Sequence, residues 1–228
     1  MASAIGNKYP GRNGLGDGQS DRPSSFEEFG IRAEIISGLQ AMNIMRPFNV
    51  QAKFLDHLLN NPSENLIGIA HPGAGKTTAY CLSILQQLDL STETARNTPQ
   101  VVVLVPTARV ARQVANQLRA IGRFLHGLTV STLSGTRDSD EGGCSVIIGE
   151  PTRVSLVSLM WGLSREGDEI RMFILDDIVE CRFLPCRTIK RNSSRSFLCD
   201  TPLGRGYSNP RAECEDHPDP TWAEFTCN

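Results

Sequence analysis

The sequence lacks any apolar run that approaches the ~20 residues of a membrane-spanning helix, so we expect no membrane insertion. It also lacks a large charge of either sign, since the formal net charge is -2. Any contact with nucleic acid must therefore come from a local surface and not from a polycationic body. The first residues contain no apolar segment of the kind that marks a secretory signal peptide, and we expect residues 1–24 to form a disordered tail.

Cysteine pairs with metal-binding spacing are missing as well. The chain has seven cysteines, but none of them forms a C-x-x-C pair, which argues against a zinc site. Cys81 and Cys144 lie within the predicted domain, and we expect them to be small buried side chains. Without a secretory signal, the thiols are expected to stay reduced.

The chain has 228 residues, which is enough for one α/β domain with tails. Short apolar segments that are typical of strands alternate with helical segments. The strands are predicted at residues 66–70, 101–105, 129–133, 145–149 and 172–176, and the helices at residues 32–42, 50–60, 76–89, after residue 106, and at 152–162. This alternation predicts a parallel sheet flanked by helices, with ligands bound beyond the carboxyl ends of its strands.

A glycine-rich loop follows the first predicted strand. It consists of Ala70, His71, Pro72, Gly73, Ala74, Gly75, Lys76 and Thr77, and it leads through Thr78 into a predicted helix. Glycines let backbone N–H groups turn toward a polyphosphate, and the helix N-terminus adds a partial positive charge. Lys76 would bind the β- and γ-phosphates, and Thr77 would ligate Mg²⁺. The arrangement predicts an ATP site, against the alternative of a chance glycine-rich turn.

Two carboxylates stand at the end of another predicted strand. Asp176 and Asp177 follow the apolar residues 172–175. A carboxylate at such a position can help to hold Mg²⁺, and its neighbour can orient or deprotonate the attacking water. The alternative is a surface pair of aspartates without a catalytic role.

Residues 43–51, which read Asn-Ile-Met-Arg-Pro-Phe-Asn-Val-Gln, resemble the Q-motif of the DEAD-box RNA helicase family. Phe26 stands upstream at the family's aromatic position, so the motif region spans residues 26–51. The resemblance implies a RecA-like P-loop NTPase domain in which the Gln51 amide reads the adenine edge and the Phe26 ring stacks on the base. A glutamine amide offers both a donor and an acceptor, which suits adenine. Taken alone, the two residues would be better explained as a core phenylalanine and a surface glutamine.

Further segments resemble the motifs with which this family contacts the RNA backbone. Residues 106–113 resemble the motif after the second strand, and residues 149–153 resemble the Thr-Pro-Gly-Arg motif, with Glu150 in place of its Thr. The resemblance implies that RNA is bound by Pro106, Thr107, Arg109, Gly135, Pro151 and Arg153. Glu150 would repel a phosphate, which lowers the expected RNA affinity.

Residues 176–179 stand where the family has Asp-Glu-Ala-Asp. By that resemblance, Lys76, Asp176 and Asp177 are the catalytic residues, and Thr77 and Asp176 hold Mg²⁺. Asp177 replaces the catalytic Glu and is one methylene shorter, and a displacement of ~1 Å can cost ~10²-fold in rate. The family's second RecA-like domain supplies arginines, and an arginine finger is worth ~10³–10⁵ in related reactions. We therefore expect ATP and Mg²⁺ binding with little or no independent hydrolysis or unwinding.

The predicted domain covers residues 25–180. The apolar residues of 181–228 do not recur at the spacing of a helix or a strand, so we expect an irregular C-terminal tail and no further strands. The loss of helix and strand patterns after residue 180 fits either a truncated or mis-spliced reading frame or a genuine interaction tail.

Residues 60–65, before the strand that leads into the phosphate loop, resemble the same segment in a subgroup of the family. That subgroup remodels mRNA–protein complexes during export at the nuclear pore. That resemblance implies RNA and nuclear-pore or mRNA-export proteins as partners of a monomer in the cytoplasm and nucleus.

Three alternative functions are compatible with this sequence. The first is an ATP-dependent RNA helicase domain, which the intact loop at residues 73–77 favours. The second is a non-catalytic, degenerate helicase fragment that binds nucleotide or a protein, which Asp177 and Val179 favour. The third is an unrelated P-loop NTPase such as a small kinase, against which Gln51 and residues 106–113 argue.

Overall fold

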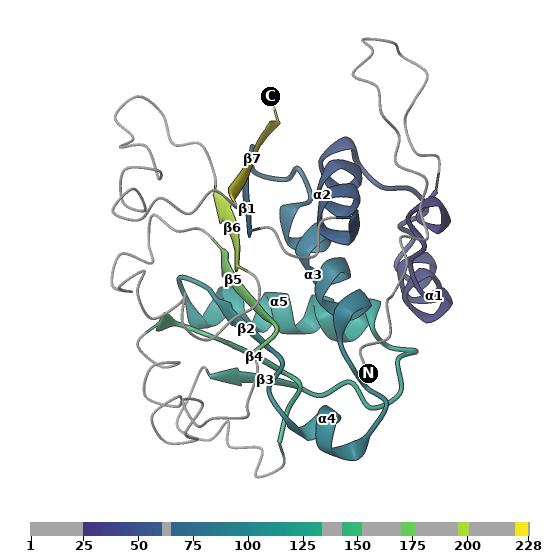
Figure 1. The fold of residues 1–228 in the computed structure, drawn as a ribbon, viewed down its shortest axis with the longest axis vertical. Helices are drawn as coiled ribbons and strands as arrows, with labels where there is room; N and C mark the ends of the chain where they lie inside the picture. The colour runs from purple at the N-terminus through teal and green to yellow at the C-terminus, as the bar shows by residue number, and fades with distance from the viewer. Residues whose placement is uncertain are drawn as a thin grey trace, which may run out of the picture.

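The computed structural model describes residues 25–60, 65–133, 143–151, 170–176, 196–200 and 222–227. The predicted N-terminal tail and the predicted helix at 152–162 lie outside these residues. Within them, the chain forms one parallel sheet of seven strands in the order β3-β4-β2-β5-β6-β1-β7 (Figure 1). The strands are β1 (Asn65–Ala70), β2 (Val101–Leu104), β3 (Val130–Leu133), β4 (Val146–Gly149), β5 (Met172–Asp176), β6 (Ser196–Asp200) and β7 (Trp222–Cys227).

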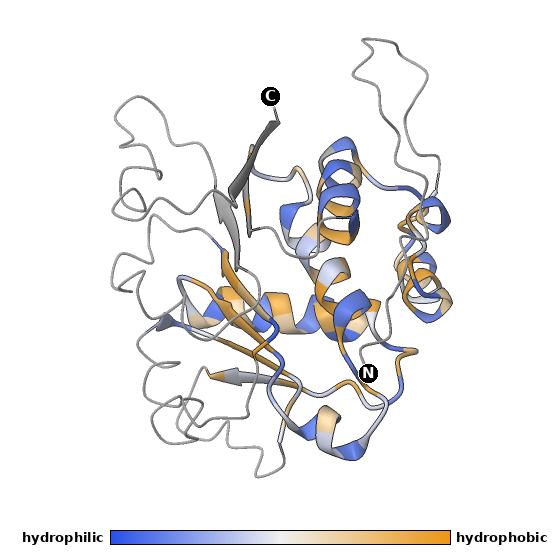
Figure 2. Ribbon diagram, viewed as in Figure 1, coloured by the Kyte–Doolittle hydropathy of each residue, from blue (hydrophilic) through white to orange (hydrophobic). Residues whose placement is uncertain are grey.

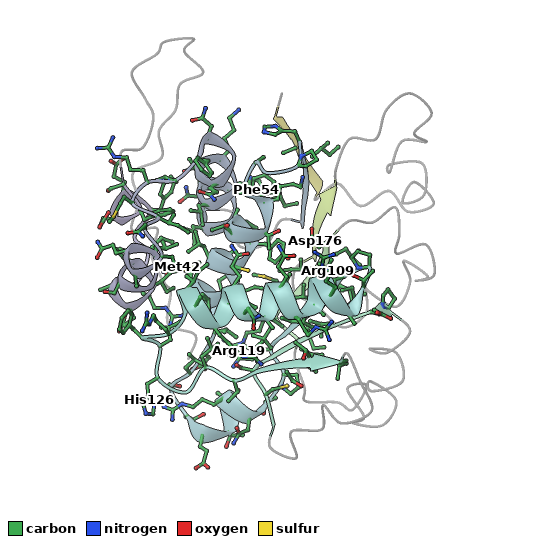
Figure 3. The ribbon with its side chains drawn as sticks, turned by 180° about the vertical axis from the view of Figure 1, so that it is seen from behind. Met42, Phe54, Arg109, Arg119, His126 and Asp176 are labelled. Carbon is green, nitrogen blue, oxygen red and sulfur yellow. The ribbon has the colours of Figure 1, made fainter. Side chains whose placement is uncertain are left out.

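The described helices precede β1 or follow β1 and β2. They are the short 3-10 helix η1 (Glu27–Phe29) and the α-helices α1 (Ala33–Ala41), α2 (Asn49–Asn60), α3 (Lys76–Gln87), α4 (Glu93–Asn97) and α5 (Ala108–Ile121). α3 packs against α2 and α5, and α5 packs against β3 and β4. Figure 3 shows α5 lying across the sheet on the side nearest to the viewer. The predicted parallel sheet with flanking helices is confirmed, and the five predicted strands agree with β1 to β5 within one residue at each end.

The central strands are apolar because both of their faces are covered. Residues 101–105 are all buried, as a strand without polar alternation requires. Figure 2 shows β2, β4 and β5 as the hydrophobic centre of the sheet. The apolar stripe of α5 packs on this centre through Val114, Leu118 and Ile121, which are buried as their spacing predicts. Cys81 and Cys144 are buried cysteines, which confirms that expectation.

The expectation of no strands after residue 180 is wrong. β6 pairs in parallel with both β1 and β5, and β7 pairs in parallel with the other edge of β1. β1 therefore has a strand on each side of it. β6 and β7 include the polar residues Ser196, Asp200, Glu224 and Thr226, so neither is an uninterrupted apolar run like β2. No helix of the described residues is long and apolar enough to cross a membrane.

A close contact between two helices offers a test of this packing. A Cβ atom on Gly38 of α1 would lie 1.8 Å from the backbone oxygen of Ile121 at the end of α5. We expect Gly38→Ala to lower the free energy of unfolding by about 1–3 kcal/mol through overpacking. That loss outweighs the gain of up to about 1 kcal/mol that alanine normally brings to a helix.

Urea unfolding would measure this difference. Ser37→Ala is the matched control, because Ser37 is the exposed neighbour and bonds only within the helix, to the Ala33 oxygen. It should change stability by no more than about 0.5 kcal/mol. A Gly38→Ala protein that is as stable as its parent would contradict the described contact between α1 and α5.

Candidate nucleotide-binding site

The loop between β1 and α3 has the backbone conformation that a phosphate-binding loop needs. Gly73 and Gly75 have φ angles of 81° and 87°, in the left-handed region that favours glycine. At Gly75 there is also no space for a side chain, because a Cβ atom would lie 2.5 Å from Nε2 of Gln51. α3 begins directly after this residue, at Lys76. The backbone N–H groups of the first turn of α3 are therefore presented next to the loop.

The ammonium group of Lys76 folds back over the loop. Its Nζ donates hydrogen bonds to the carbonyl oxygens of Ala70 and His71, the second at 3.3 Å. The side chain is half-buried, and His71, Pro72 and Gly73 are exposed around it. A cation in this position lies where the phosphates of a nucleotide would enter the loop.

Thr77 and Thr78 follow in the first turn of α3 and differ in their surroundings. Thr77 is half-buried, so its hydroxyl remains available at the loop. Thr78 is buried, and its Oγ1 accepts a hydrogen bond of 2.7 Å from Nε2 of Gln117 on α5. Thr78 thus ties α3 to α5.

Gln51 lies against the loop from the side of α2. It is only 2% exposed, and its Oε1 accepts a hydrogen bond of 2.9 Å from the backbone N–H of Phe48. Its Nε2 is the atom that excludes a side chain at Gly75. The surface position offered as the alternative for Gln51 is wrong, because the amide is buried between α2 and the loop.

The two phenylalanines of this region have opposite environments. Phe26 is 2% exposed and belongs to the main hydrophobic core, as its alternative explanation predicts. Phe48 is 64% exposed, although its ring is close enough to Gly75 to lie 3.3 Å from a Cβ atom built there. Phe48 was not predicted from the sequence as a site residue, because nothing in the pattern distinguishes an exposed aromatic residue from a buried one.

Asp176 is the last residue of β5, so it lies at the same carboxyl-terminal end of the strands as the phosphate loop. Its Oδ2 accepts a hydrogen bond of 2.9 Å from the hydroxyl of Tyr80, a fully buried residue of α3. Tyr80 therefore connects the helix that begins the phosphate loop to the strand that carries the acidic group. Tyr80 was not predicted from the sequence, because its spacing on α3 fits an ordinary core position.

The donor set at this edge fits Mg²⁺ held jointly with a nucleotide. Magnesium prefers hard oxygen ligands and commonly takes only one or two protein groups besides water and phosphate. The Thr77 hydroxyl and the Asp176 carboxylate are groups of that kind. The described residues contain no cluster of three His, Cys, Asp or Glu side chains that would hold a metal without a nucleotide.

The charge of Asp176 also affects the interior of α3. Burial raises the pKa of the Cys81 thiol well above its ordinary value, and the negative charge of Asp176 raises this pKa further. Cys81 therefore stays a neutral thiol beside the site and does not act as a nucleophile.

A second group of candidate residues lies at the ends of β2 and β4. Pro106 is half-buried, and Thr107 is exposed and caps α5, since its Oγ1 accepts from the N–H of Val110 at 3.3 Å. Arg109 is exposed at the start of α5, on the same side of the molecule as Asp176 (Figure 3). Pro151 follows β4 and is half-buried. Asp177, Gly135 and Arg153 lie outside the described residues.

Comparison with known proteins identifies the family. The model of the DEAD/DEAH box helicase family matches residues 48–182. The chain belongs to this family. The ATP-dependent RNA helicase dbp5 of Aspergillus oryzae is 39% identical over 157 residues, which cover 67% of this chain and 32% of the relative. The protein of the same name from Emericella nidulans is 44% identical over 108 residues, or 47% of this chain and 23% of the relative. The chain thus spans about a third of the length of such relatives.

Solved structures of DEAD-box proteins agree in fold. A Dbp5 variant from S. cerevisiae, bound to a Gle1 variant and IP6, matches with a TM-score of 0.72 at 23% identity, over 90% of this chain and 53% of that chain. A DEAD box protein from Methanococcus jannaschii matches with a TM-score of 0.71 at 17% identity, over 89% of this chain and 56% of that one. These likenesses establish the RecA-like fold of this DEAD-box chain.

The bond between Tyr80 and Asp176 predicts a specific effect on metal binding. Tyr80→Phe removes the hydroxyl and keeps the ring, so Asp176 loses one group that orients it. We expect the factor by which Mg²⁺ strengthens ATP binding to fall about three- to tenfold, in line with the ~0.5–1.5 kcal/mol net contribution of one hydrogen bond. ATP affinity in EDTA should stay unchanged.

Calorimetry with and without Mg²⁺ separates the two effects. Ser83→Ala is the control, because it removes another buried hydroxyl of α3, one that accepts from Gln87 and not from the site. Equal Mg²⁺ dependence in the parent and in Tyr80→Phe would mean that the hydroxyl has no part in metal binding.

Proposed function

We propose that this chain is the N-terminal, ATP-binding RecA-like half of a DEAD-box RNA helicase, and that it binds ATP–Mg²⁺ and the RNA backbone. The observation that carries the proposal is the formed phosphate loop, in which Lys76 is held by the carbonyls of Ala70 and His71 at the sheet edge that also carries Asp176. In this proposal Lys76 and the first turn of α3 bind the phosphates, while Thr77 and Asp176 bind Mg²⁺.

Adenine selection is assigned to the Q-motif. The buried Gln51 keeps its amide beside Gly75, so the same side chain can support the loop and contact the base edge. Stacking by Phe26 would require its ring to leave the core, where it is 2% exposed. The proposed domain spans residues 25–180, and two later strands complete its sheet, with β6 between β5 and β1 and β7 beside β1.

The partners proposed are RNA and proteins of mRNA export at the nuclear pore. The support comes from relatives: structures of S. cerevisiae Dbp5 are described as bound to RNA and ADP BeF3, and others as bound to Gle1 or Nup159. A monomer located in the cytoplasm and nucleus follows from the same resemblance.

Hydrolysis by the chain alone is proposed to be weak or absent. The acidic pair has Asp177 where the family has Glu, and a shorter side chain displaces the carboxylate from the attacking water. The arginines of a second RecA-like domain, worth ~10³–10⁵ in related reactions, would have to come from elsewhere. The alternative function is a non-catalytic module that binds nucleotide or protein.

Removing the loop lysine tests nucleotide binding. We expect Lys76→Ala to weaken ATP and ADP binding about 10- to 100-fold in calorimetry with Mg²⁺, because charge-assisted hydrogen bonds to the phosphates are lost. Lys53→Ala is the matched control, since it removes an exposed lysine from α2 and should leave both affinities as they were. A folded parent protein that binds neither nucleotide would refute the proposal in favour of the partner-binding module.

A restoration experiment separates the catalytic family function from the degenerate module. Asp177→Glu in a fusion to the second RecA-like domain of a dbp5 relative should raise ATP turnover by at least ~10²-fold over the unfused chain. A steady-state phosphate-release assay measures this turnover, and the same fusion with Lys76→Ala must remain inactive. Turnover that stays flat in the restored fusion would favour the module.

A further inference from the structure

We infer that Glu150 acts as an internal anion at the N-terminus of α5 and thereby weakens the binding of RNA phosphate at this edge of the sheet. The inference rests on the proposed function, because it concerns the RNA surface assigned there. It makes Glu150 the residue that sets how strongly this chain binds nucleic acid.

The contact itself joins two segments that are distant in the sequence. The backbone N–H of Ala108, the first residue of α5, donates a hydrogen bond of 2.7 Å to Oε1 of Glu150, and the pair is partly buried. The sheet causes this meeting, since β2 and β4 are paired neighbours. The N–H of Val105 continues their pairing with a hydrogen bond of 3.0 Å to the Gly149 oxygen. The residue after β4 is therefore fixed beside the start of α5.

The start of α5 would otherwise attract an external anion. α5 has 14 residues, and the N–H groups of the first turn of such a helix have no partner within the helix and carry a partial positive charge. In this chain the N–H of Val110 is capped by Thr107, and that of Ala108 is taken by Glu150. Two of the groups that could bind a phosphate oxygen are therefore already used.

The carboxylate also stands among the residues assigned to RNA. Pro106, Thr107 and Arg109 lie on the α5 side of the contact, and Pro151 follows Glu150 directly. A phosphate that approached the N-terminus of α5 would meet the negative charge of Glu150. Glu150 thus competes with RNA for the Ala108 N–H and also repels the phosphates of the RNA backbone.

Two substitutions test this inference by a gain of binding. Glu150→Gln keeps an acceptor for the Ala108 N–H and removes the charge, while Glu150→Thr frees the N–H as well. We expect both to bind a fluorescein-labelled oligouridine about three- to tenfold more tightly in fluorescence anisotropy. The slope of log affinity against log salt should steepen by ~0.7, as expected for one more phosphate contact with a single strand.

Glu93→Gln is the matched control, because it makes the same change of charge at an exposed position on α4. It should bind the RNA as the parent does. Equal RNA affinity and equal salt slope in the parent and both Glu150 variants would overturn the inference and leave the proposed RNA binding intact. Absence of RNA binding by Glu150→Gln at low salt, in a sample that still binds ATP, would overturn both.

Discussion

The parallel pairing of β6 with β1 on one side and with β5 on the other holds the parts of the nucleotide site in place. β1 delivers the phosphate loop and β5 delivers Asp176, and these two strands are not neighbours. The register Ile69↔Asp200 and Asp176↔Cys199 brings both strand ends to the same level across β6. Tyr80 then spans the remaining space with its hydroxyl. The geometry of the site therefore depends on a strand that has no functional motif of its own.

The phosphate loop is supported from two directions. Its glycines adopt φ angles that other residues adopt only with strain, and the Gln51 amide fills the space in front of Gly75. Lys76 meanwhile satisfies two carbonyl groups of the loop. A ligand phosphate would replace those carbonyls as the partner of the ammonium group. The loop is thus close to its binding conformation before any nucleotide arrives, which lowers the ordering cost of binding.

The phosphate loop and the proposed RNA-binding surface at the start of α5 differ in the charges that they present. At the P-loop, a cation and helix N–H groups are presented toward the ligand, with the carboxylate of Asp176 set apart and bonded to Tyr80. At the start of α5, a carboxylate of the chain itself takes the place of a ligand anion. On the proposed function, one protein would retain a nucleotide-binding loop while its nucleic-acid surface is weakened.

The sequence by itself determined β1 to β5, the phosphate loop and its family, because uninterrupted apolar runs and a Gly-Lys-Thr step between strand and helix are local patterns. It did not predict β6 or β7, which both pair with β1, a strand that lies more than a hundred residues earlier along the chain. It also left Phe26 and Gln51 open between two environments, and the fold buried both. The contacts of Tyr80 with Asp176 and of Glu150 with Ala108 join residues that no sequence period relates. Only the tertiary structure decided them, because the order of strands in a sheet sets which loops meet at its carboxyl edge.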